Sequence, residues 1–174
     1  MITDLVQLRT IAEAKAAENL DFQRFVRQHH GSAHLFREIA AEVESQIDCR
    51  ECGACCRETY VDVTPAEIAV IAEHLGTSVE NATHQYTLLD PTDHHVILRH
   101  TGGGCTFLDG TVCMIYEARP GPCRHFPHID STSHTLGSRM ESVMRRTCYC
   151  PIVFNTLEDF KHKLGYHYHP HVAQ

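Results

Sequence analysis

The sequence predicts an α+β fold with an N-terminal helical hairpin, a small antiparallel sheet and many loops. Apolar residues recur every three or four positions over the first 48 residues, which indicates amphipathic helices. Short segments further along alternate apolar with polar residues, and an Asp-Gly pair between two of them indicates a tight hairpin. The third observation concerns the nine cysteines. Four fall within eight residues, at 49, 52, 55 and 56, and five follow, at 105, 113, 123, 148 and 150.

Length and composition predict a single domain over residues 1–174, because 43 % of the residues are hydrophobic and can form a core. Its parts are a helical segment (1–48), a cysteine-cluster core (49–151) and a C-terminal helix with a His-rich tail (152–174). The net charge of −7, without any Lys/Arg-rich run, argues against a nucleic-acid partner. No stretch approaches the roughly 18 apolar residues of a membrane span. The N-terminus lacks a secretory signal, so a cytoplasmic location is expected.

Two helices are expected before the first cysteine. The first covers residues 3–29, with Thr3 as its N-cap and a kink near residues 19–21, where the apolar stripe changes position. Gly31 ends it, and Ser32 caps a second helix whose apolar face is Leu35, Phe36, Ile39, Val43 and Ile47. The two helices are expected to pack as a hairpin that covers the core. A docking surface for a protein partner on these first 48 residues is the alternative.

Thr64 marks the start of the next helix. Its hydroxyl caps the helix, Pro65 takes the first helical position and Glu67 completes a capping box. Gly76 is expected to end this helix. The residues before it, 59–63, alternate valines with polar residues and predict a short strand.

Weaker signals follow along the chain. A helix is expected over residues 78–88 and a strand over residues 95–100. Residues 102–104 are three glycines, which let the backbone approach a neighbour closely. Near the end of the chain, Thr156 is expected to start a short helix over residues 156–163.

The first cysteines have metal-ligand spacing. Cys49, Cys52 and Cys55 follow the C-x2-C-x2-C pattern that bacterial ferredoxins use for three of the four ligands of a cubane iron–sulfur cluster. The fourth ligand in such proteins is distant and followed by proline, as is Cys150. A C-x2-C pair equally builds a four-thiolate zinc site with a later pair of cysteines. Disulfides are disfavoured in a reducing cytoplasm, so the sequence predicts a bound iron–sulfur cluster or Zn²⁺.

Two local features bear on how many metal sites exist. Cys55 and Cys56 are adjacent, and neighbouring side chains of an extended backbone point to opposite sides. We therefore expect two sites that share this loop, or a polynuclear cluster with a bridging thiolate. A two-residue loop in the Asp-Gly hairpin would put Cys105 and Cys113 on opposite faces, whereas a three-residue loop with a bulge would put both on one face.

Cys123 lies in a proline-rich segment between Arg119 and Arg124. Either the two guanidinium groups offset the negative charge of a thiolate site, or they pair with surface carboxylates. His125 is expected to lie beside the site rather than to ligate. The histidines near the C-terminus are expected to form a frayed polar end, with adventitious metal binding as the alternative: His162, His167, His169 and His171.

The cysteines belong to a longer series of motifs. The series reads Cys49-x-x-Cys-Gly-x-Cys-Cys56, Val63-Thr-Pro-Ala-Glu-Ile68, Cys105-x-Phe-Leu-Asp, Cys113-x-Ile-Tyr-x-x-Arg-Pro-x-x-Cys-Arg and Cys150-Pro. Over residues 49–151 it resembles the bacterial CxxCxxCC family, the YkgJ-type cysteine-cluster proteins to which zinc or iron chelation is assigned. The final Cys-Pro-Gly of that family stands here as Cys150-Pro151-Ile152.

The resemblance implies metal ligation by eight of the nine cysteines: Cys49, Cys52, Cys55, Cys56, Cys105, Cys113, Cys123 and Cys150. It leaves Cys148 as the extra thiol, although Cys148 and Cys150 can exchange roles. Relatives are labelled iron–sulfur oxidoreductases, and a flagellin lysine methylase is related, but neither label transfers an activity to this chain.

Three functions are compatible with these features. The first is a metal-binding protein that holds zinc or an iron–sulfur cluster in a structural, metal-handling or electron-transfer role. The second is an enzyme whose cluster supports redox chemistry or methyl transfer, and the third is a zinc-stapled protein-interaction module. The sequence lacks the signatures of a dinucleotide site, a serine-hydrolase elbow, a zinc protease and a radical-adenosylmethionine enzyme. Metal binding is therefore favoured over catalysis.

Overall fold

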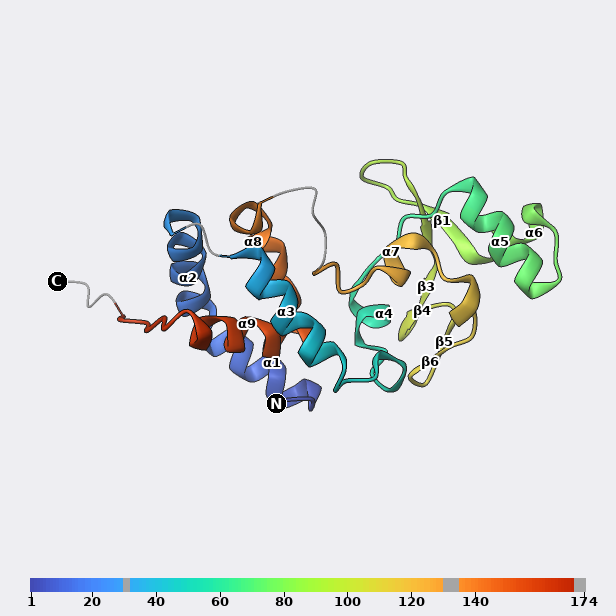
Figure 1. Ribbon diagram of the computed structural model, residues 1–174. Coiled ribbons are helices and arrows are strands. Elements are labelled where there is room, and N and C mark those ends of the chain that lie inside the picture. Colours follow the sequence, from blue (N-terminus) through green and yellow to red (C-terminus); the bar gives the residue numbers. More distant parts are fainter. Residues whose placement is uncertain (30–31, 130–134, 171–174) are drawn as a thin grey trace. The chain divides into compact units, whose positions relative to one another are not determined.

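The computed structural model of the chain describes residues 1–29, 32–129 and 135–170. The α+β class is confirmed, because helices are combined with small two-stranded antiparallel sheets (Figure 1). The chain forms two compact units, which we call unit 1 (Met1–Asp48 with Pro127–Gln174) and unit 2 (Cys49–Phe126). Unit 1 thus combines both ends of the chain. The expectation of a single domain stays a prediction. No helix in the described ranges is long and apolar enough to cross a membrane.

Unit 1 is a helical bundle. Its described helices are α1 (Leu5–Ala14), α2 (Ala16–Gln28), α3 (Ala33–Glu44), α8 (Leu136–Arg146) and α9 (Pro151–Lys163). α9 packs against α1, α3 and α8, and α2 packs against α8 (Figure 1). The N-terminal helices, expected to pair with each other, are therefore completed by two C-terminal helices. The largest fully buried side chains come from both ends of the chain: Leu8, Phe22, Phe36, Met140, Leu157 and Phe160.

The start of unit 1 differs from the prediction in two ways. The helix break falls at Lys15, between α1 and α2, so the predicted kink near residues 19–21 is wrong. The N-cap is Asp4 rather than Thr3. The Asp4 carboxylate accepts a hydrogen bond from the Gln7 N–H at 2.7 Å, and its negative charge is favoured at this end of a helix.

The second predicted helix is α3. Ser32 caps it as predicted, because the Ser32 Oγ accepts a hydrogen bond from the Leu35 N–H at 3.1 Å. The predicted apolar face is confirmed at Phe36, Ile39 and Val43, which are buried. Gly31 lies outside the described residues.

The C-terminal helix α9 starts earlier than predicted. It begins at Pro151, and Thr156 is buried inside it, so the predicted start at Thr156 is wrong. Proline suits the first helical position because its missing N–H is not needed there. Asn155 ties the N-terminal segment to α9. Its Oδ1 accepts from the Ile2 N–H at 2.8 Å, and its Nδ2 donates to the Ile2 carbonyl at 2.8 Å.

Four charged side chains form a closed ring of ion pairs near the start of α2 and the end of α9. The Lys161 Nζ lies 2.7 Å from both Glu18 Oε1 and Glu158 Oε1. The Lys15 Nζ lies 3.0 Å from Glu18 Oε2 and 2.7 Å from Glu158 Oε2. The Lys161 side chain is only 5 % exposed, and Asn19 Oδ1 accepts its third hydrogen bond at 2.6 Å. A buried ammonium is tolerated when all its protons have acceptors, so this ring joins α2 to α9.

Replacing Lys161 by alanine is expected to lower the free energy of unfolding by about 3 kcal/mol, because Glu18 and Glu158 keep only Lys15 as a counterion. Lys163→Ala, at an exposed position on α9, is the matched control and should change it by less than about 0.5 kcal/mol. Denaturant titration followed by circular dichroism measures both. Equal stabilities for the two variants would contradict a structural role of the ring.

Unit 2 combines two longer helices with three short hairpins. The helices are α5 (Pro65–Leu75) and α6 (Val79–Tyr86). The antiparallel strand pairs are β1 (Thr87–Leu89) with β2 (Val96–Leu98), β3 (His100–Thr101) with β4 (Gly104–Cys105), and β5 (Leu108–Asp109) with β6 (Val112–Cys113). Short helical turns complete the unit: η1 (Cys49–Glu51), α4 (Ala54–Glu58), η2 (Tyr116–Ala118) and α7 (Gly121–Arg124).

Local signals predicted most of unit 2. The helix from Thr64 is confirmed as α5, with both hydrogen bonds of the capping box and Gly76 at its end. The helix expected over residues 78–88 is α6, which ends earlier because β1 follows directly. The strand expected over residues 59–63 is wrong. This segment makes one isolated bridge, between Asp62 and β2, before the chain turns into α5.

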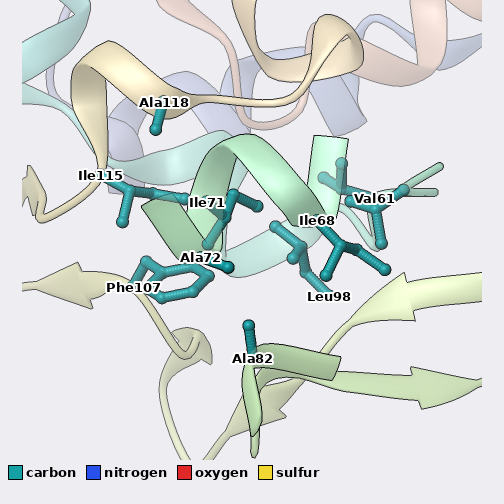
Figure 2. Close-up of a cluster of buried hydrophobic side chains, with 10 residues drawn as sticks. Val61, Ile68, Ile71, Ala72, Ala82, Leu98, Phe107, Ile115 and Ala118 are labelled. Atoms are coloured by element: carbon teal, nitrogen blue, oxygen red, sulfur yellow. The ribbon is translucent and has the colours of Figure 1, made fainter. Parts of the chain in front are cut away.

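α5 builds the core of unit 2 with one apolar face. Figure 2 shows Ile71 and Ala72 of this helix beside Phe107, with Ile115 next to them. The full set of buried side chains is Val61, Val63, Ile68, Ile71, Ala72, Ala82, Leu98, Phe107, Ile115 and Ala118. Three cysteines, at 105, 113 and 123, pack against the edge of this cluster, so the core positions them.

Candidate metal centre

The cysteines are divided between the two units. Unit 2 holds seven, and the cysteines of the described chain are thiols rather than disulfides. Within unit 2 they stand on separate short elements: Cys49 on η1, Cys55 and Cys56 on α4, Cys105 on β4, Cys113 on β6 and Cys123 on α7, with Cys52 between η1 and α4.

Four thiols form a group in which every pair interacts electrostatically, and we call it the thiol quartet: Cys56, Cys105, Cys113 and Cys123. Burial raises the pKa of Cys105 to about 11 and the pKa of Cys123 to about 12, and it also raises the pKa of Cys113. The negative charge of neighbouring thiolates acts in the same direction. At neutral pH these three thiols hold protons, which a metal ion must displace in order to bind.

Cys56 differs from the other members of the quartet, because its pKa is lowered to about 7. A hydrogen bond from the Cys55 thiol stabilises the Cys56 thiolate, and the guanidinium groups of Arg57 and Arg119 add to this effect. Together they outweigh burial, which alone would raise the pKa. Cys56 is therefore the member with the most thiolate character at neutral pH.

The adjacent thiols Cys55 and Cys56 do not point to opposite sides. They stand on the helix α4 rather than on the extended backbone assumed in the prediction. Successive side chains of a helix are about 100° apart, so neighbouring thiols can meet, and here they share a hydrogen bond. The premise that favoured two separate sites or a bridging thiolate is therefore wrong, because both thiols can face one centre.

Two members of the quartet share one local arrangement. The backbone N–H of Phe107 hydrogen-bonds the Cys105 sulfur, and the N–H of Ile115 hydrogen-bonds the Cys113 sulfur. In both cases the donor lies two residues after the cysteine and its side chain is buried in the core. Backbone N–H groups aimed at sulfur favour the thiolate form, which is the form that ligates a metal.

The predicted hairpin is confirmed, but its register differs from both alternatives. The pairs are Leu108 with Cys113 and Asp109 with Val112, which leaves the two-residue loop Gly110-Thr111. Gly110 has a φ of 59°, the conformation required of the first residue in a Gly-X loop. Cys105 belongs to the preceding hairpin, so it interacts with Cys113 between hairpins and not across one.

Gly104 lets β4 lie directly on α4. Its φ is 137°, and a Cβ at this position would stand 2.8 Å from the Cys56 carbonyl oxygen and 3.1 Å from the Arg57 Cα. This is the close backbone approach expected for residues 102–104. It brings the strand that carries Cys105 against the helix that carries Cys56.

Arg119 stands beside three members of the quartet. It lowers the pKa of Cys56, Cys113 and Cys123. The guanidinium carbon lies 3.6 Å from the centroid of the Tyr116 ring, and Nε donates to the Tyr116 carbonyl at 2.9 Å. Of the two predicted roles, charge compensation therefore fits Arg119. Arg124 instead donates to the Arg119 carbonyl at 2.5 Å and attracts the Glu67 carboxylate.

Arg57 is a site residue that sequence analysis missed. It lowers the pKa of Cys56, and its guanidinium donates to the Gly110 carbonyl and, at 3.4 Å, to the Cys52 carbonyl. These bonds connect α4 to the tip of the β5–β6 hairpin. A cation directly after two adjacent cysteines was the available signal.

The other predicted ligands stand outside the quartet. Cys49 is exposed, Cys52 and Cys55 are half-buried, and Cys150 is buried at the N-cap of α9 in unit 1. Cys148 packs against the apolar cluster around Phe154. Among the described residues, no three His, Cys, Asp or Glu side chains lie close enough as they stand to hold a metal ion. The quartet is thus within electrostatic range but wider than a ligand set around one ion, and ligation by the eight cysteines stays a prediction.

The predicted histidines have other surroundings. The His125 Nδ1 lies 2.8 Å from the carbonyl oxygen of Gly121 on its own turn. His162 is exposed on α9, and His167 and His169 lie in the irregular segment after it. His171 is outside the described residues.

A comparison with protein families bears directly on the cysteine pattern. Residues 48–151 match the family described as "CxxCxxCC: Putative zinc- or iron-chelating domain". The chain belongs to the CxxCxxCC family. No curated protein and no solved structure matches the chain. The donor set of this CxxCxxCC chain agrees with the family description, because half-buried thiols with N–H groups directed at sulfur suit zinc and iron.

Gly104→Ala is expected to weaken metal binding and to lower the melting temperature, because the new Cβ would collide with the backbone of Cys56 in a conformation that alanine disfavours. Gly103→Ala is the control, because a Cβ there meets nothing within 4 Å. Zinc titration with a competing chelator and thermal melts measure the two effects. Equal zinc affinities and melting temperatures of the two variants would show that the packing of β4 on α4 does not depend on a glycine at residue 104.

Binding of one Zn²⁺ by the quartet at pH 7 is expected to release roughly three to four protons, because only Cys56 has a pKa near 7 and the other three thiols have raised values. The affinity should therefore rise with pH and fall steeply below pH 7. Calorimetry in buffers of different ionisation enthalpy counts the protons. Release of fewer than about two would contradict ligation by these four thiols.

Proposed function

We propose that unit 2 binds a thiophilic metal at the thiol quartet, as a four-thiolate zinc site or as an iron–sulfur cluster. The observation that carries this proposal is the mutual interaction of all four thiols, which come from α4, β4, β6 and α7. Four cysteine thiolates complete the coordination of Zn²⁺, and they equally hold a cubane cluster. Arg57 and Arg119 would offset part of the negative charge of either group.

The remaining thiols of unit 2 extend the proposal. Cys49, Cys52 and Cys55 keep the spacing of iron–sulfur ligands and lie directly before Cys56. We include them as further ligands, either of the same centre or of a second one. Cys150 stays a predicted ligand, with Cys148 as its substitute.

The role that fits best is metal handling or electron transfer. The thiols of unit 2 are half-buried or exposed rather than enclosed, so a metal held by them would lie close to the surface. Exchange of metal ions or electrons with a partner requires such a position, since the rates of both processes decrease as the metal lies deeper in the protein. A protein partner that docks on residues 1–48 remains part of this proposal.

A structural role is the second candidate, and one observation favours it. The hairpins that carry Cys105 and Cys113 have strands of only two residues each. Hairpins of this length are not stable alone, so a metal that joins them would contribute to folding. In that case the chain is a zinc-stapled module, and its metal would not exchange.

Elemental analysis and an anaerobic absorption spectrum of the purified full chain are the deciding measurements. Broad visible absorption with iron and sulfide indicates a cluster, whereas a colourless protein with zinc indicates a four-thiolate site. Cys105→Ser and Cys123→Ser should each weaken metal binding, because one of four thiolates is lost, while Val112→Ser, an exposed position beside Cys113 on β6, is the control and should bind as the wild type does. A wild-type chain that takes up neither metal would refute the proposal.

Unfolding of the chain by a chelator would assign the structural role. Retention of the fold after complete metal removal would assign the handling or transfer role. Circular dichroism before and after chelation, with the metal content measured in the same samples, distinguishes the two.

A further inference from the structure

The Glu67 carboxylate serves two segments of unit 2 at once. Its Oε2 completes the capping box of α5, accepting from the Thr64 N–H and from the Thr64 Oγ1, both at 2.8 Å. Its Oε1 accepts a hydrogen bond from the Gly121 N–H at 2.7 Å, across 54 residues of sequence. The capping box needs only the first oxygen. The second oxygen is therefore a separate tertiary link from α5 to α7.

The Gly121 link holds the turn that carries Cys123. The flanking residues Pro120 and Pro122 have no N–H, so Gly121 is the only donor among these three residues. The N–H groups of Cys123 and Arg124 both donate to the Pro120 carbonyl at 3.0 Å, which closes the turn. A displacement of Gly121 would consequently move Cys123.

The contact is close and charged. A Cβ on residue 121 would stand 3.2 Å from the Glu67 Oε1, so the approach leaves little room for a side chain. Burial alone would raise the pKa of Glu67. Hydrogen bonds from Thr64 and Gly121 and the charge of Arg124 outweigh this effect, so the pKa lies below its usual value. Glu67 is thus ionised at neutral pH, and charge-assisted hydrogen bonds of this kind are the strong ones.

The geometry points to Glu67 as a positioning residue of the metal centre, which fixes the α7 turn and thereby presents Cys123 to the other three thiols. This inference rests on the proposed metal binding by the quartet. It also gives the Glu of the motif Val63-Thr-Pro-Ala-Glu-Ile68 a role beyond starting a helix, because the same side chain reaches the cysteine motif that follows far along the chain.

Two variants separate the positioning role from the capping role. Glu67→Asp keeps a negative charge at the start of α5 but is one methylene shorter, so it should lose its reach to Gly121. Thr64→Ala removes the capping hydroxyl and its bond to Glu67 Oε2, but it keeps the backbone N–H that donates to this oxygen and the bond from Gly121 to Oε1. Gly121→Ala perturbs the same hydrogen bond at its donor residue, and it replaces Glu67→Asp if that variant does not fold. Cys123→Ser serves as the reference for a lost ligand.

The experiment loads the full chain anaerobically with Co²⁺, whose thiolate charge-transfer absorption scales with the number of sulfur ligands. Alkylation of Cys123 by iodoacetamide in the loaded protein is followed by peptide mass spectrometry, and melts of the metal-free variants report stability. For Glu67→Asp we expect charge-transfer absorption reduced by about a quarter, as in Cys123→Ser, because one of four thiolates is lost. Cys123 should be alkylated roughly fivefold faster than in the wild type. Thr64→Ala should show neither change, even if its melting temperature falls as much as that of Glu67→Asp.

Two results would overturn the positioning role alone. The first is a wild-type cobalt spectrum and a protected Cys123 in both Glu67→Asp and Gly121→Ala. The second is equal exposure of Cys123 in Thr64→Ala, which would assign the effect to the start of α5. A wild-type chain that binds no Co²⁺, or whose four thiols stay equally reactive with and without it, would overturn the proposed function and this inference together.

Discussion

Unit 2 depends on a backbone that holds four sulfur atoms near one another, although the charge of neighbouring thiolates raises the pKa of three of them. The apolar core provides most of this support. Phe107 and Ile115 are each buried two residues after a cysteine, and each uses its own N–H to hydrogen-bond that cysteine's sulfur. Burying the side chain therefore fixes the sulfur as well. α5 contributes Ile68, Ile71 and Ala72 to this core, so a helix without any cysteine supports the arrangement of the thiols (Figure 2).

The charges around the quartet follow from the same constraint. A Zn²⁺ ion with four thiolates carries about two negative charges, which a partly buried site must balance. Arg57 and Arg119 are the two cations that lower the pKa of Cys56, and their number matches this charge. Both are also fixed by backbone carbonyls, of Gly110 and of Tyr116. The two guanidinium groups are thus already in place before a metal binds. Metal binding then loses less side-chain entropy than it would with two mobile cations.

Sequence patterns predicted the elements whose signals are local. The capping box at Thr64 and the cap at Ser32 are side-chain to backbone bonds within one turn, and both are present. The Asp-Gly pair predicted a hairpin correctly, but not its register, and the tip of the hairpin makes a contact far away in sequence, since Arg57 donates to the Gly110 carbonyl. The helix α8 was not predicted, although Leu136, Met140 and Val143 mark its buried side. That stripe is short and surrounded by charged residues, so it becomes apolar surface only when α2 and α9 cover it.

The candidate site was predictable as a list of cysteines but not as an arrangement. Spacing grouped Cys49, Cys52 and Cys55, whereas the structure groups Cys56 with thiols from later segments. Sequence spacing reports only neighbours along one turn, and the quartet is assembled by tertiary packing. We attribute the helical state of α4 to tertiary packing as well. Nothing in Cys55-Cys56 itself favours a helix, but Gly104 allows β4 to pack directly on this segment.

The order of the two units along the chain has a consequence for biosynthesis. Unit 2 is one continuous segment, whereas α1 and α3 of unit 1 pack against α9, which is synthesised after unit 2. Domains generally form as they emerge, so the middle of this protein can acquire its structure while the first helices still wait for their partners. During that interval the apolar faces of the N-terminal segment are uncovered. A nascent chain stalled before residue 151 would therefore be a client for holding chaperones even though its cysteine-bearing centre was already folded.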